Sequence, residues 1–126
     1  MFDSTSIAFA AGGAFVAGLV ALARRAASPP WIVWGALSLA FLAFSTLAIV
    51  TEGPTGFWPE HTRHLWGNQI WFDLLLAGTV AWAALVPRLR KAGMTPLPWA
   101  ALIVATGSIG LLAMFARLSY LEREAR

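Results

Sequence analysis

Four segments of this chain are almost entirely apolar, and each is about as long as a bilayer is thick. They cover residues 7–23, 31–50, 69–86 and 97–116. A helix rises about 1.5 Å per residue, so about 20 residues cross the roughly 30 Å hydrocarbon core. In lipid, only helices and closed barrels satisfy their backbone polar groups, and these runs do not alternate as barrel strands would. The sequence therefore predicts an all-α integral membrane four-helix bundle, with one transmembrane domain over residues 1–126.

Composition agrees with a bilayer environment. Hydrophobic residues make up 59% of the 126 positions and charged residues only 12%, about half the share expected of a soluble domain. The first apolar segment has no preceding Lys or Arg and is followed by Arg24 and Arg25, the reverse of the charge order of a signal peptide, so we expect it to be retained. The chain has no cysteine, which excludes disulfides and thiolate chemistry.

Basic residues predict how the bundle is oriented. The connectors after the first and third segments carry five basic residues and no acid: Arg24, Arg25, Arg88, Arg90 and Lys91. Because such loops stay in the cytoplasm, we predict a multi-pass protein of a bacterial inner membrane with both termini in the periplasm. The margin is small, since four basic residues fall on the other side. The formal charge of +3 arises at the membrane edges and does not indicate nucleic-acid binding.

Aromatic residues lie where these boundaries place the membrane interfaces. In this arrangement Trp31 lies at the cytoplasmic interface, whereas Trp71 and Tyr120 lie near the outer one. Amphipathic rings prefer the headgroup level. Most of the seven tryptophans are therefore interpreted as membrane anchors.

One carboxylate lies inside an apolar segment. Asp73 falls about 6 to 8 Å below the outer end of its predicted helix, where a charge is costly. On the antiparallel last segment, Arg117 reaches the same depth. We therefore predict an intramembrane pair of Asp73 and Arg117, with Asn68 and Gln69 completing the hydrogen bonds of the carboxylate. The alternative is that Asp73 is a site for a proton or a substrate.

The connector of residues 51–67 carries polar sequence of its own. It contains a cluster of acids and histidines expected at the outer face: Glu52, Glu60, His61 and His64. Two histidines three residues apart with carboxylates nearby suit zinc or iron. Arg63 between the histidines would repel a cation, and no longer metal motif accompanies them. We favour a solvated interfacial turn, and we predict neither a metal nor another cofactor.

A set of short motifs marks the second half of the chain. It comprises Asn68, Phe72-Asp73-Leu74, an arginine-rich helix end with Gly93-Met94, a glycine at 107 or 110, and the terminal run 117–124. In these motifs the chain resembles a family of small bacterial membrane proteins known only as a domain of unknown function. It departs at residues 112–115, where that family usually has a Pro-Leu-Phe-Leu-like stretch. The resemblance implies a bacterial inner-membrane setting and brings no activity with it.

Three functions remain open. The first is an accessory or interaction subunit that packs on a larger membrane complex or on copies of itself. The second is a small proton-coupled carrier that uses Asp73. The third is a membrane enzyme that acts on an isoprenoid, a quinone or a lipid with the outer cluster. An enzyme needs convergent side chains and a carrier needs an acid reachable from both sides, whereas a subunit needs neither, and we favour the subunit. Its expected partners are the lipid bilayer and other membrane proteins, with no nucleic acid.

Overall fold

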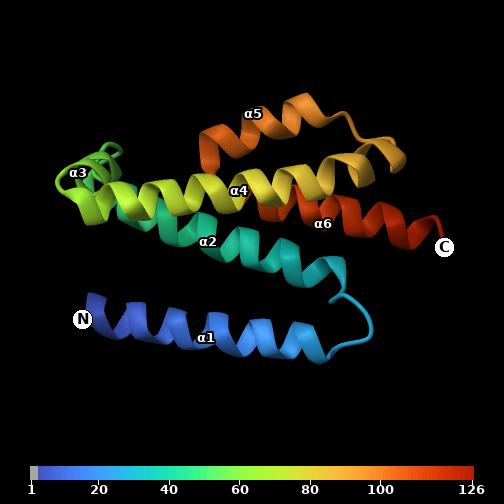
Figure 1. The fold of residues 1–126 in the computed structure, drawn as a ribbon, viewed down its shortest axis with the longest axis horizontal. Helices are drawn as coiled ribbons and strands as arrows, with labels where there is room; N and C mark the ends of the chain where they lie inside the picture. Colours follow the sequence, from blue (N-terminus) through green and yellow to red (C-terminus); the bar gives the residue numbers. More distant parts are fainter. Residues whose placement is uncertain (1–2) are drawn as a thin grey trace.

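The chain is all-helical in the computed structural model, which describes residues 3–126 (Figure 1). Its six helices are α1 (Ser4–Arg24), α2 (Trp31–Glu52), α3 (Phe57–Thr62), α4 (Leu65–Lys91), α5 (Pro96–Thr106) and α6 (Ser108–Glu124). α1, α2 and α4 are long and apolar enough to cross a membrane. The prediction of an all-α chain with long apolar helices is therefore confirmed. Three of the four expected spans are helices of sufficient length and hydropathy to cross a membrane.

The long helices begin and end at residues that favour helix termini. Asp3 caps α1, and its carboxylate accepts a hydrogen bond from the Ser6 amide at 3.3 Å, as an N-cap residue does. α2 starts directly after Pro30 and ends at Gly53, whose φ of 88° suits glycine. α4 extends the predicted 69–86 segment at both ends, and three basic residues in its last turn complement the helix dipole.

The predicted fourth span, residues 97–116, is wrong as a single helix. The chain reverses at Gly107, whose φ of 62° and ψ of −127° form a combination that only glycine adopts readily. α5 and α6 therefore lie side by side as an antiparallel hairpin (Figure 1). At Gly110 the helices approach so closely that an added Cβ would lie 2.8 Å from the Thr106 hydroxyl and 3.0 Å from the Leu102 carbonyl carbon. Two glycines thus make the reversal possible.

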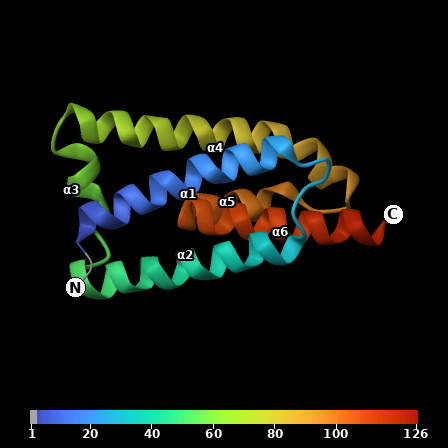
Figure 2. The ribbon, with the colours of Figure 1, turned by 90° about the horizontal axis from the view of Figure 1, so that it is seen from below.

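α6 lies between α2 and α4 (Figure 2) and makes most of the packing in the described chain. Its contact with α2 is the largest, and the buried Ser38 hydroxyl donates to the Ile109 carbonyl oxygen at 2.8 Å. In an apolar setting such an interhelical bond is worth about 1 kcal/mol. The core joins α4, the α4–α5 connector and α6 through Leu89, Met94, Met114 and Leu118. It therefore lies at one end of the molecule.

The reversal also places the C-terminal tail at the end opposite to the one predicted. Arg88 near the end of α4 donates to both carboxylate oxygens of Glu122 near the end of α6, at 2.9 and 2.7 Å. These hydrogen bonds hold the pKa of the Glu122 carboxyl below its ordinary value. Trp31, which begins α2, meets Tyr120 with ring centroids 5.5 Å apart, although the sequence predicted them at opposite interfaces. The tail thus lies beside the connectors after α1 and α4, away from the start of α1.

α1 stands apart from the rest of the described chain. No other helix packs closely against it, and none of its residues is buried. A Cβ added at Gly12, Gly13 or Gly18 would meet no atom within 4 Å. The expected four-helix membrane bundle is therefore not confirmed, because residues 3–126 form α2, α4 and a hairpin, with α1 alongside.

Candidate functional site

Asp73 lies on an exposed face of α4 that forms a shallow groove of about 360 Å³. The groove is lined by Leu65, Asn68, Gln69, Phe72, Asp73 and Leu76. All six residues belong to α4, so no other helix of residues 3–126 covers this face. The hairpin reaches only part of the way along α2 and α4, and the half of α4 that carries Asp73 extends beyond it (Figure 1). The carboxylate therefore lies on an uncovered and largely apolar surface.

The structure does not bring Asp73 and Arg117 together. Arg117 lies near the start of α2, and its guanidinium carbon is 5.6 Å from the ring centroid of Tyr120. Among residues 3–126 the ion pairs are Glu60 with Arg63 and Arg88 with Glu122. The predicted pair assumed a straight last helix that would carry Arg117 to the depth of Asp73. Because the chain reverses at Gly107, α6 runs back towards the end of the molecule at which α5 begins.

The predicted supporting residues do not bind Asp73 either. The Asn68 side-chain amide donates to the His61 carbonyl oxygen at 2.6 Å, so Asn68 ties α4 to α3. Gln69 is exposed on the same face as Asp73, and no hydrogen bond joins their side chains in the described part of the chain. Asp73 consequently has neither an ion-pair partner nor a hydrogen-bond partner there.

The histidines of the outer cluster have separate structural roles. His64 is the N-cap of α4, and its Nδ1 accepts a hydrogen bond from the Gly67 amide at 3.1 Å. His61 lies on α3 with its ring 5.0 Å from that of Trp71. The two histidines lie three residues apart in the sequence, but α3 ends at Thr62, before His64, so they belong to different elements. Sequence reasoning missed the capping role because histidine is not among the residues that usually cap helices.

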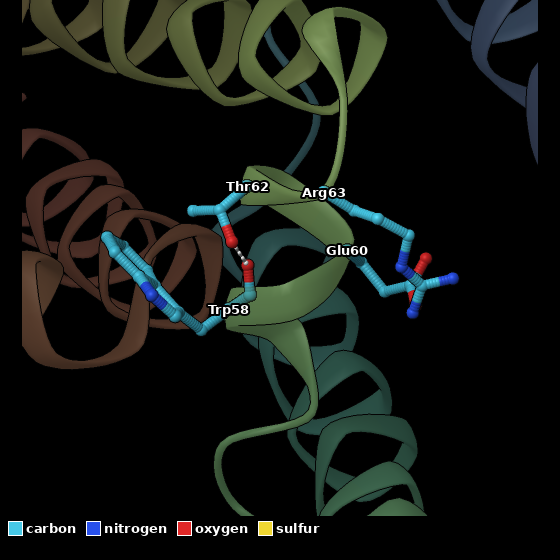
Figure 3. A network of polar contacts seen from close by, with 4 residues as sticks. All are labelled: Trp58, Glu60, Thr62 and Arg63. Atoms are coloured by element: carbon cyan, nitrogen blue, oxygen red, sulfur yellow. Dashed lines mark hydrogen bonds and ion pairs between the residues drawn. The ribbon is translucent and has the colours of Figure 1, made fainter.

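The acids of the outer cluster do not join the histidines. Glu60 pairs with Arg63 at 2.7 Å on the exposed side of α3, while Thr62 donates to the Trp58 carbonyl oxygen at 2.8 Å (Figure 3). Glu52 is exposed at the end of α2. No group of three His, Cys, Asp or Glu side chains able to hold a metal ion occurs among residues 3–126. The outer cluster is thus divided between the end of α2, α3 and the N-cap of α4.

Gly67 fixes the corner between α3 and α4, a role that the sequence did not reveal. A Cβ at this position would collide with the Glu60 carbonyl oxygen and lie 3.1 Å from the His61 carbonyl carbon. Trp71, predicted to lie near the outer interface, packs near Phe57 and His61 of α3. α3 thus forms a fixed cap over the first turns of α4, beside the groove that contains Asp73.

Residues 3–126 leave two surfaces uncovered. One is the whole of α1, and the other is the apolar groove around Asp73. Among residues 3–126 the Asp73 carboxylate has no ion-pair partner. Both surfaces are suited to binding another molecule.

The chain was compared with protein families, curated proteins and solved structures. No family model, no curated protein and no solved structure matches it. The resemblance to small bacterial membrane proteins therefore stays a prediction.

Proposed function

We propose that this protein is an integral membrane interaction subunit, which packs on a larger membrane complex in a bacterial inner membrane. The observation that carries the proposal is the isolation of α1, which is long and apolar enough to span a bilayer but packs against no other helix of the described chain. A self-sufficient bundle would pack all its helices together. α1 is therefore proposed to contact a helix of another subunit.

The residue types on α1 support a protein neighbour over lipid alone. One face of α1 carries small residues at helical spacing: Ala10, Ala14, Gly18 and Ala21. Small residues let two helix backbones approach closely, and this approach drives association in membranes where the hydrophobic effect does not. The open space around Gly18 leaves room for such a neighbour.

The proposed topology has three crossings and a hairpin that enters the membrane without crossing it. α5 has 11 residues and is about 16 Å long, roughly half of the hydrocarbon thickness. Of the nine Lys and Arg, all but Arg63 lie near the end that contains the connectors after α1 and α4. By the positive-inside rule this end is cytoplasmic. The N-terminal end of α1 is then periplasmic and the C-terminal tail cytoplasmic.

Asp73 fits the same proposal as a polar contact to the partner. It lies in the outer half of α4 on an uncovered face, so a donor on a neighbouring helix would compensate the carboxylate. A proton-coupled carrier is the second candidate, favoured by the exposure of Asp73 and by its lack of a partner in residues 3–126. Proton flux into proteoliposomes that Asp73→Asn abolishes would favour the carrier, whereas the subunit hypothesis expects no flux.

Substitutions on opposite faces of α1 test the subunit hypothesis. Gly18→Leu fills the proposed contact face, and Gly12→Leu adds the same side chain on the opposite face, where space is equally open. We expect a stable complex to be captured with the wild-type protein after mild detergent extraction and native electrophoresis. Gly18→Leu should release most of the partner, because the two backbones can no longer approach.

Gly12→Leu is the matched control and should retain the complex. The proposal would be contradicted if the wild-type protein migrated as a single chain bound only to lipid. It would also be contradicted if the two leucine variants lost the partner equally, since the loss would then reflect a general effect on α1.

A further inference from the structure

A recess between α2 and α6 opens at the basic end of the molecule. It has a volume of about 270 Å³ and is lined by Trp31, Ala116, Arg117 and Tyr120. Trp31 is the first residue of α2, and its ring packs edge to face against Tyr120, with centroids 5.5 Å apart. Both rings are half-buried. The recess therefore combines aromatic walls with one cation.

Among residues 3–126 no carboxylate lies within ion-pair distance of the Arg117 guanidinium. Glu122, which is also on α6, pairs with Arg88. The guanidinium carbon of Arg117 lies 5.6 Å from the ring centroid of Tyr120, and a cation–π contact leaves the guanidinium donors free for an anion.

Arg117 and Tyr120 are three residues apart on α6, and side chains at this spacing lie on the same face of a helix. The cation and the aromatic ring therefore belong to one face of α6, beside the first residue of α2.

We propose that this recess binds the headgroup phosphate of an anionic phospholipid. Trp and Tyr rings prefer the headgroup level, a guanidinium matches two phosphate oxygens at once, and basic pockets between helices attract anionic lipids. The neighbouring basic side chains do not line the recess. The inference goes beyond the proposed subunit role and rests only on the placement of α2 and α6 in a bilayer.

Lipid competition in the reconstituted protein tests the site. The purified chain is inserted into nanodiscs of equal phosphatidylglycerol and phosphatidylcholine, and the lipids that stay bound are counted by native mass spectrometry. We expect the wild-type protein to retain phosphatidylglycerol about fivefold more often, the effect of one basic side chain near an anionic surface. Arg117→Gln should remove this preference, and Arg117→Lys, which keeps the charge but not the two-pronged geometry, should keep part of it.

Arg123→Gln is the matched control, because it removes the same charge from the exposed last turn of α6 outside the recess. It should keep the preference. An equal loss in Arg117→Gln and Arg123→Gln, or no preference in the wild-type protein, would overturn the site while leaving the proposed topology intact. Equal retention of free inorganic phosphate would overturn the lipid assignment. Failure of the chain to insert into nanodiscs would contradict both the topology and the site.

Discussion

Gly110→Ala is expected to destabilise the protein, although alanine is the better helix former. The added Cβ would lie 2.8 Å from the Thr106 hydroxyl and 3.0 Å from backbone atoms of Ile103 and Leu102. Because backbone atoms of α5 cannot swing aside as a side chain can, α5 and α6 must separate. Overpacking of this kind costs about 1 to 3 kcal/mol. Thermal unfolding in detergent, followed by circular dichroism, measures the effect.

Gly78→Ala provides the matched control in the interior of α4. A Cβ there meets no atom within 4 Å, so only helix propensity changes, and the stability should rise by up to about 1 kcal/mol. The two glycine substitutions are thus expected to shift the melting temperature in opposite directions. A Gly110→Ala variant that melts at or above the Gly78→Ala temperature would show that α5 and α6 are not in close contact.

Gly67→Ala should have a comparable effect at the other end of the molecule. The new Cβ would collide with the Glu60 carbonyl oxygen, so α3 must move away from α4, and the hydrogen bond from Asn68 to the His61 carbonyl oxygen would be lost. We expect a loss of about 3 kcal/mol, at the upper end for overpacking, because a backbone atom blocks the site.

Limited proteolysis provides a local readout of that change. Arg63 lies directly between α3 and α4, so trypsin should cut after it faster once the corner opens. Gly78→Ala, remote from this corner, should be cut at the wild-type rate. Unchanged cleavage in Gly67→Ala together with an unchanged melting temperature would contradict the close packing of α3 on α4.

The long helices could be predicted from sequence because apolar length and flanking breakers are local properties. Pro30 and Gly53 delimit α2 in the sequence as they do in the structure. The conformational role of Gly107 could not be predicted from sequence in the same way. A glycine in an apolar run either lets helices pack closely or adopts a positive φ, and only the fold determines which. Gly107 adopts the positive φ, with a value of 62°.

The main errors at the candidate site follow from this one residue. A straight last helix would bring Arg117 to the depth of Asp73, whereas the hairpin takes it to Trp31 and Tyr120. The small predicted difference in basic residues between the two sides of the membrane has the same origin. The reversal moves the C-terminal arginines to the end of the molecule that contains the connectors after α1 and α4. The role of Gly67 was not predictable, because it depends on the position of the Glu60 carbonyl oxygen.

Cysteine accessibility is the most direct test of the hairpin and of the topology proposed from it. The natural chain has no cysteine, so Ser4→Cys, Thr55→Cys, Thr95→Cys and Ala125→Cys can each be labelled singly in intact cells with a membrane-impermeant maleimide. Our account predicts that Ser4→Cys and Thr55→Cys label from outside, while Thr95→Cys and Ala125→Cys label only after the membrane is permeabilised. Labelling of Ala125→Cys from the same side as Ser4→Cys, and opposite to Thr95→Cys, would show that the last segment crosses the bilayer and would contradict the hairpin.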